Sequence, residues 1–310
     1  MLISSNITPD MTRSKRGDTG FLNKLLHIGL VRVVLGIAAL VPINFIHHFF
    51  WDMLRDMEGP IAPYVKDLER VSMIVVLILL YKAYVYLVDQ RPAYEVSTSN
   101  LLPEFGVGFA FGAGLIALTV LPIALSGSYH IDGFGAYSIL FHGIIMMAFY
   151  ALLEDLLFRA VLYRIVEEKL GTWLSVILVA SLFGTIHIFN DNATWVSSLA
   201  LAVGDLSLAA VFVLTRRIWM VWGLHVGWNF SQDTLLGMAN SGTEGSPSFI
   251  MSRVEGPTWL TGGDFGVELS VLGVFSSLFL GLYLMKIAAK RGLIIPPVWK
   301  RKAEVSNVSE

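Results

Sequence analysis

The chain has no cysteine among its 310 residues, which excludes disulfides, thiolate nucleophiles and zinc or iron–sulfur sites held by cysteine. Charged residues are scarce as well, at 15% against 55% hydrophobic residues, and this is not the composition of a water-soluble enzyme. The 22 Lys+Arg and 24 Asp+Glu leave a net charge of −2, so no overall field attracts nucleic acid. Carboxylate, histidine, hydroxyl and lysine chemistry remains.

Long apolar stretches predict a membrane protein, because about 20 apolar residues form a helix that spans the hydrocarbon core of a bilayer. Eight such stretches occur, at 33–51, 71–88, 105–131, 137–163, 172–189, 193–215, 218–236 and 269–285. The first is too long for a cleaved signal peptide and lacks a small-residue cleavage site. We therefore predict an all-α, polytopic membrane protein with eight transmembrane helices.

The distribution of Lys and Arg predicts the orientation of these helices, since positive residues are retained on the cytoplasmic side of short loops. With the N-terminus inside, only Arg55, Lys66, Arg70 and Arg253 lie in outer loops. The cytoplasmic segments hold Arg13, Lys15, Arg16, Lys24, Arg91, Arg164, Lys169, Arg216, Arg217, Lys286, Lys290, Arg291, Lys300, Arg301 and Lys302. An even number of spans then places both termini in the cytoplasm.

Three charges interrupt the fourth stretch, where each costs roughly 2.5 to 3.5 kcal/mol on insertion scales. Asp155 and Arg159 are four residues apart, so they share a helix face and can pair. Glu154 points about 100 degrees away from Asp155 and has no obvious partner. An unpaired carboxylate inside a membrane is a functional candidate. The alternative is an ion-pair network that fixes helix packing.

Two histidines support the functional interpretation. The other five are interpreted as solvated (His27, His47, His48, His130) or as a packing residue (His142). Phe183 and His187 lie four residues apart on one face of the fifth predicted helix, and His225 and Asn229 do so on the seventh. Gly227 permits a close approach of another helix there. Two histidines, an amide and a spare glutamate form a set that can activate water.

These motifs, Glu154-Asp155 with Arg159, Phe183 with His187, and His225 with Asn229, resemble those of the CAAX prenyl protease and bacteriocin-processing (CPBP, Abi/CAAX amino-terminal protease) family of intramembrane endopeptidases. The resemblance covers about 148–230. The family's first motif usually has two glutamates, and Asp155 replaces the second one here. We divide the chain into a basic cytoplasmic segment at 1–27, a transmembrane helical domain at 28–296 with a protease-like core at 137–236, and a polar basic tail at 297–310.

The resemblance implies that Glu154 is the general base that activates water, and that His187 positions this water or shuttles its proton. His225 and Asn229 would then donate hydrogen bonds to the oxyanion, with Asp155, Arg159 and Phe183 in supporting positions. A competing mechanism uses Glu154, His187 and His225 as three zinc ligands with an open fourth position. The spacing does not separate the two mechanisms, so the cofactor is either none or Zn²⁺, and we favour the metal-free version.

Helix rise gives a check on depth. At about 1.5 Å per residue, His225 lies about 10 Å from the inner end of its helix, and Glu154 lies in the inner half of its own. His187 would lie about 22 Å up, which is inconsistent with a shared site unless the fifth helix begins in the cytosol or tilts strongly. Asp205, near several small residues, is interpreted as a structural acid, and Glu167-Glu168 as a solvated helix end.

The expected function is an intramembrane endopeptidase that hydrolyses a peptide bond of a membrane-proximal or lipidated peptide in a bacterial plasma membrane. Its partners would be a peptide or protein substrate and the lipid bilayer, with no nucleic acid. One alternative is a non-catalytic membrane immunity or assembly protein with the same fold. Another is a proton-coupled carrier, although the Gly/Pro-interrupted repeats of carriers are not evident. The Gly/Ser-rich connection at 237–268 is interpreted as a flexible outer loop rather than a lid.

Overall fold

The structure is a computed structural model that describes residues 7–15, 25–26, 28–54, 56–243 and 246–301. Arg16, Lys24, His27, Arg55 and Lys302, used in the predictions above, lie outside the described residues. The longer helices are α2 (Gly29–Leu40), α3 (Pro42–Leu54), α4 (Ala62–Tyr84), α5 (Leu101–Leu125), α6 (Ser138–Asp155), α7 (Arg164–Ile186), α8 (Trp195–Thr215), α9 (Ile218–Asn229) and α11 (Val271–Lys290).

Short elements extend or connect these helices. The π-helical segments η2 (Val85–Asp89), η4 (Leu156–Tyr163) and η6 (Phe230–Leu235) continue α4, α6 and α9. The remaining short helices are η1 (Pro9–Thr12), η3 (Tyr94–Val96), η5 (His187–Phe189), α10 (Thr258–Thr261), η7 (Gly263–Phe265) and η8 (Val267–Leu269). Helix η4 follows the Glu154-Asp155 motif and η6 follows Asn229, and π-helical turns of this kind are frequent at functional sites.

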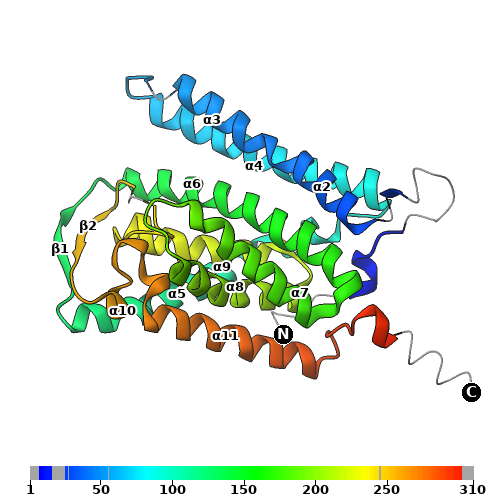
Figure 1. Ribbon diagram of the computed structural model, residues 1–310. Coiled ribbons are helices and arrows are strands. Elements are labelled where there is room, and N and C mark those ends of the chain that lie inside the picture. The colour runs from blue at the N-terminus through cyan, green and yellow to red at the C-terminus, as the bar shows by residue number, and fades with distance from the viewer. Residues whose placement is uncertain (1–6, 16–24, 27, 55, 244–245, 302–310) are drawn as a thin grey trace, which may run out of the picture.

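The helices form one bundle with a separate layer along one side. Helices α2, α3 and α4 make up that layer, and α5 to α9 with α11 make up the bundle beneath it (Figure 1). A two-stranded antiparallel sheet of β1 (Tyr129–Phe134) and β2 (Ile250–Val254) lies at the end of the bundle opposite the C-terminal end of α11 (Figure 1). The third span was predicted to lie within 105–131, and α5 ends at Leu125, before β1 begins. The sheet corrects one prediction, because β2 gives regular structure to a connection interpreted as flexible.

Six helical segments within the described residues are long and apolar enough to cross a membrane: Gly29–Leu54, Ala62–Asp89, Leu101–Leu125, Ser138–Phe189, Trp195–Thr215 and Val271–Lys290. The 52-residue segment Ser138–Phe189 contains both the fourth and the fifth predicted spans. The seventh predicted span corresponds to α9 and η6, which are not among the six. The architecture is that of an all-α polytopic membrane protein with one small β-hairpin, while the count of eight spans and the orientation of the termini stay predictions.

The distribution of polarity is the reverse of that in a soluble protein. Large apolar side chains lie on the outside, with Leu102 78% exposed, Leu118 67% exposed and Phe279 73% exposed, as expected where lipid replaces water. Several charged side chains, in contrast, are buried, among them Arg164 and Arg216. A buried charge is costly unless it is paired, so these groups must have partners.

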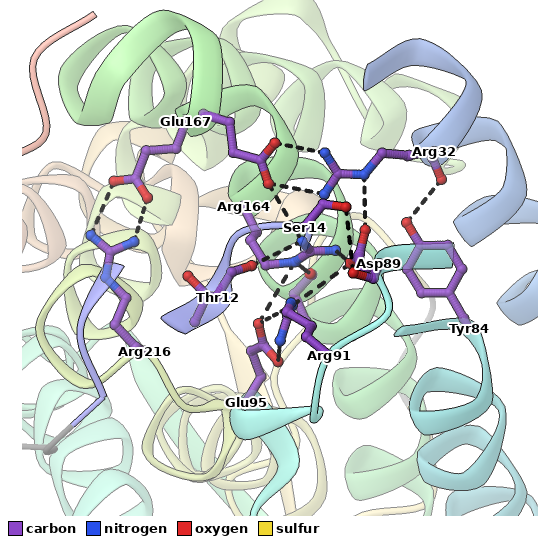
Figure 2. Close-up of polar contacts among 12 residues, drawn as sticks. Thr12, Ser14, Arg32, Tyr84, Asp89, Arg91, Glu95, Arg164, Glu167 and Arg216 are labelled. Atoms are coloured by element: carbon purple, nitrogen blue, oxygen red, sulfur yellow. Dashed lines mark hydrogen bonds and ion pairs between the residues drawn. The ribbon is translucent and has the colours of Figure 1, made fainter. Parts of the chain in front are cut away.

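The partners form an ion network beside η1, which Figure 2 shows. The pairs, by closest distance, are Arg32–Asp89 (2.9 Å), Arg32–Glu168 (2.6 Å), Arg91–Glu95 (2.7 Å), Arg164–Asp89 (2.6 Å) and Arg216–Glu167. Arg164 Nη1 also donates to the carbonyl of Thr12, 3.1 Å away, so the N-terminal segment joins the network. Glu167 is buried, and its interpretation as part of a solvated helix end is therefore wrong.

A second polar cluster joins α3, α4 and α6. His47 Nδ1 lies 2.9 Å from Glu69 Oε2, and the ring is 2% exposed, so the interpretation of His47 as solvated is also wrong. Tyr150 connects this pair to α6, since its hydroxyl lies 3.4 Å from His47 Nε2. His142, interpreted as a packing residue, contacts the Asp67 carboxylate. These contacts anchor the layer of α2 to α4 on the bundle.

Candidate active site

A sharp reversal at Gly171 sets the relative depth of the site residues. Gly171 has φ 73° and ψ 173°, a conformation that divides α7 into two arms and that side chains with a Cβ rarely adopt. Glu154 lies 17 residues before this reversal and His187 lies 16 residues after it, so both are about 25 Å along their arms. The sequence placed His187 and Glu154 at different depths because it predicted that the helix of Glu154 ends at Tyr163. In the structure this helix continues to Gly171, so the two residues lie at similar depths.

Paired glycines position α9 against α5. A Cβ atom at Gly108, Gly112, Gly223 or Gly227 would lie 2.1 to 2.3 Å from a backbone carbonyl oxygen of the facing helix. The carbonyls belong to Met220 and Leu224 for the glycines of α5, and to Phe105 and Phe109 for those of α9. Such reciprocal contacts bring two backbones together as small-xxx-small motifs do. The predicted close approach at Gly227 is present, and it fixes the helix that carries His225 and Asn229.

A single imidazole lies between the two acids of the first motif. His225 Nε2 is 3.6 Å from Glu154 Oε2, and His225 Nδ1 is 3.3 Å from Asp155 Oδ1. The Asp155 side chain is fully buried, whereas that of Glu154 is 34% exposed. Asp155 therefore orients the ring from inside the protein, and Glu154 is the acid that remains accessible.

Arg159 lies behind this arrangement and pairs with two acids. Its Nη1 is 3.3 Å from Asp155 Oδ1, as the i,i+4 spacing predicts, and its Nη2 contacts Asp205 Oδ1. The guanidinium also lies 4.8 Å from the centre of the Phe183 ring, within the range of a cation–π contact. Sequence reasoning interpreted Asp205 as a structural acid and missed this pairing. The signal that could have found it is that Asp205 lies in a predicted membrane span, 193–215, that contains no Lys or Arg.

The histidine of the second motif has a defined tautomer. His187 Nδ1 lies 2.7 Å from the carbonyl oxygen of Phe183, and because a carbonyl only accepts, Nδ1 carries the proton. In the neutral ring, Nε2 is then free to accept a proton. The Phe183 ring packs 4.6 Å from the His187 ring and 6.3 Å from the His225 ring, measured between centroids. Phe183 thus separates and spaces the two histidines.

One cavity of about 460 Å³ collects the predicted residues, and this volume is typical of a ligand-binding site. Glu154, Phe183, His187, His225 and Asn229 line it. Asp155 and Arg159 lie behind its wall through the contacts described above. The cavity is also lined by Asp205, interpreted as a structural acid, and by residues that the sequence analysis did not consider, namely Asn190, Asp233, Asn240, Ser241 and Glu268. Asn240, Ser241 and Glu268 lie in the connection at 237–268 that was interpreted as flexible.

The residues do not form a metal site as they stand. The three alternative zinc ligands, Glu154, His187 and His225, line the same cavity. Among the residues that the structure describes, however, no group of three His, Asp or Glu side chains is arranged to hold a metal ion.

The comparison with protein families gives one match, to the family described as type II CAAX prenyl endopeptidase Rce1-like, over residues 136–231. Residues 136–231 therefore form a domain similar to CAAX prenyl endopeptidases. This domain contains every predicted site residue from Glu154 to Asn229, and its family is a family of proteases. Together with the six membrane-competent helices, it makes the chain an integral, multi-pass membrane protein. No curated protein and no solved structure matched the chain.

Proposed function

We propose that this protein is an intramembrane endopeptidase in which Glu154 activates water to hydrolyse a peptide bond. The observation that carries the proposal is the accessible Glu154 carboxylate, 3.6 Å from His225 Nε2, in a cavity that His187 and Asn229 also line. A buried cavity with an acid, two imidazoles and an amide supplies the base, the proton acceptor and the donors that peptide hydrolysis requires.

In the proposed reaction, ionised Glu154 takes a proton from water while the water oxygen bonds to the peptide carbonyl carbon. The carbonyl oxygen becomes an oxyanion, which accepts hydrogen bonds from His225 Nε2–H and from the Asn229 amide one turn later. Asp155 balances the charge of the His225 ring when both of its nitrogens are protonated. The carbon–nitrogen bond then breaks as Glu154 returns its proton to the leaving amine. Each preorganised oxyanion donor contributes roughly 2.7 to 4 kcal/mol.

The substrate proposed is a membrane-proximal or lipidated peptide. Met146, Met147, Leu201, Leu224 and Trp228 line the same cavity as Glu154, so an apolar chain and a peptide bond can enter together. The matched family, described as prenyl endopeptidases, supports a lipidated substrate class.

We also propose that the protein crosses a bacterial plasma membrane eight times, with both termini on the cytoplasmic side. The reversal at Gly171 divides the segment Ser138–Phe189 into two spans, and α9 with η6 adds another to the six. The excess of Lys and Arg in the segments on the side of the termini supports this orientation.

The test compares wild type with Glu154→Gln, purified and reconstituted in liposomes. The probes are a farnesylated, internally quenched peptide and its unlipidated counterpart. Loss of the general base is expected to lower kcat by about 10²- to 10⁴-fold. Glu255→Gln, at a side chain 57% exposed on the outer hairpin, is the matched control and keeps full activity. Thermal unfolding verifies that both variants are folded, and a fully active Glu154→Gln would favour a non-catalytic protein.

A further inference from the structure

The cavity differs from the rest of the interior in how its acids are paired. Elsewhere, buried carboxylates contact an arginine, as Glu167 contacts Arg216 and as Glu104 contacts Arg217 at 2.9 Å. Among the described residues, four carboxylates line the cavity, from Glu154, Asp205, Asp233 and Glu268, and no Lys or Arg does. Asp205 has Arg159 behind it, and Glu154 has His225 beside it. Asp233 and Glu268 have no such cationic neighbour.

Asp233 and Glu268 both line the cavity, and Gln232, the residue before Asp233, donates to Glu268. We call these two acids the acidic end of the cavity. Within the described residues, they are held only by neutral donors. Asp233 accepts from the Ser246 N–H at 3.2 Å, and Glu268 accepts from Gln232 Nε2 at 2.6 Å and from the Ser241 N–H at 3.0 Å. Neither acid forms an ion pair with any residue in the described part of the chain. Burial accordingly raises the pKa of Glu268 to about 7.

Unused hydrogen-bond acceptors in and beside the cavity wall point to a donor-bearing occupant. Asp205 lines the cavity and is 2% exposed, and its Oδ2 has no hydrogen-bond partner within the described residues. Gln232, the residue that holds Glu268, is fully buried, and its Oε1 likewise has no partner there. Buried acceptors without partners are costly, and a ligand that carries N–H groups or a positive charge would satisfy them.

The acidic end lies at a definite distance from the proposed scissile bond. His225, Asn229 and Asp233 are spaced four residues apart along α9 and η6, and all three line the cavity. The eight residues from His225 to Asp233 correspond to about 12 Å along the helix axis. An extended peptide advances about 3.3 Å per residue. This distance therefore corresponds to three or four residues of substrate.

We propose that the acidic end is a specificity subsite that binds a Lys or Arg side chain of the substrate, three or four residues from the scissile bond. This inference rests on the proposed endopeptidase function. A cation there would pair with Asp233 and Glu268, the two acids of the cavity that have no counter-ion among the described residues. A substrate carboxylate at the same position would meet two acids and no cation, so a free C-terminus or an acidic side chain is disfavoured.

A purely structural role for these acids makes a different prediction. Asp233 and Glu268 accept hydrogen bonds from Ser246 and Ser241, so they also anchor the outer connection. In Asp233→Asn and Glu268→Gln, the amide oxygen can still accept these bonds while the negative charge is lost. Loss of an anchor would slow the cleavage of every peptide equally, whereas loss of a subsite changes the preference among peptides.

The experiment uses the reconstituted full-length chain and farnesylated, quenched peptides that differ at one position by Lys, Gln or Glu, scanned over five residues on each side of the scissile bond. Wild type is expected to cleave the Lys peptide at least 10-fold faster than the Gln peptide, measured as kcat/KM, at one position three or four residues away. The Glu peptide is expected to be the slowest. Asp233→Asn and Glu268→Gln are expected to bring the Lys-to-Gln ratio close to one, with Glu255→Gln as the unaffected control.

Binding to the Glu154→Gln protein, measured by fluorescence anisotropy, provides a readout that needs no turnover. Tighter binding of the Lys peptide, by about 10-fold and lost on adding Asp233→Asn, would support the subsite even if no peptide were cleaved. Equal binding and equal cleavage of the Lys, Gln and Glu peptides would overturn the subsite and leave the endopeptidase proposal standing. Equal slowing of all peptides by both acid variants would overturn it as well, in favour of the anchoring role.

Discussion

The contact between α5 and α9 gives a sharp test of how the site is positioned, through the substitution Gly112→Ala. The added Cβ would lie 2.2 Å from the carbonyl oxygen of Leu224, the residue before His225. An ordinary contact of this kind begins at 3.4 Å, so the two backbones must separate by about 1.2 Å. The obstacle is backbone on both sides, and no side-chain rotation can relieve it.

The displacement acts on the helix that carries His225 and Asn229, both of which must meet a reacting peptide bond. A misplacement of about 1 Å in a catalytic group costs on the order of 100-fold in rate. We therefore expect Gly112→Ala to lower kcat on the quenched peptide by about 100-fold, with a smaller change in KM. The assay is initial-rate kinetics in liposomes, paired with thermal unfolding to measure the fraction of folded protein.

Gly114→Ala is the matched control, two residues along the same helix. No atom lies within 4 Å of a Cβ at Gly114, so the substitution removes a helical glycine without a clash and is expected to stabilise the helix by about 0.5 to 1 kcal/mol. Equal activity of the two variants, both folded, would refute the argument that close backbone packing between α5 and α9 sets the geometry of the site.

Three further predictions concern charge, backbone and pH. Arg164→Gln removes one of the buried cations that pair with Asp89 and Glu95, which keep Arg32 and Arg91 respectively. The network is then left with one negative charge that has no counter-ion, and the protein is expected to be destabilised by about 3 to 5 kcal/mol. Arg253→Gln at an exposed pair changes thermal unfolding little. Gly171→Ala imposes φ 73° on alanine and brings a Cβ to 2.6 Å from the Ile295 carbonyl oxygen, so both the melting temperature and the activity are expected to fall. The pKa of Glu268 is raised from 4.5 to about 7, so this residue favours the folded state most below pH 4.5, and that stabilisation is lost as the pH rises to about 7. Wild type should therefore lose more stability than Glu268→Gln between pH 5 and pH 8, and parallel melting curves would contradict this.

The motif residues could be predicted because their spacing is a local property. Phe183 with His187, and His225 with Asn229, share a helix face whatever the rest of the fold does, and Asp155 reaches Arg159 at the predicted i,i+4 spacing. The Arg159–Asp205 contact could not be predicted in this way, because 46 residues separate the partners. Asp205 reaches Arg159 because α8 packs against α7.

The end of the fourth predicted span was misplaced for a related reason. Arg164, Glu167 and Glu168 resemble a solvated loop in the sequence, yet they are paired inside the protein, and their helix continues toward Gly171. Their partners come from distant segments, since Arg216 is 49 residues from Glu167 and Arg32 is 136 residues from Glu168. A sequence does not distinguish a charge in water from a charge that has a remote partner, so the depth of His187 was estimated from the wrong starting point.

Whether an acid contacts an arginine distinguishes the structural acids from the proposed functional ones more clearly than burial does. Asp89 and Asp155 are both 0% exposed, and each contacts at least one arginine, which compensates for the loss of hydration. Glu154 and Glu268 contact no arginine within the part of the chain that the structure describes, and both line the cavity. An uncompensated acid costs free energy in the folded chain, and a substrate that supplies a proton or a cation recovers it only on binding. The same two acids are therefore where substitution should change turnover and substrate preference more than stability.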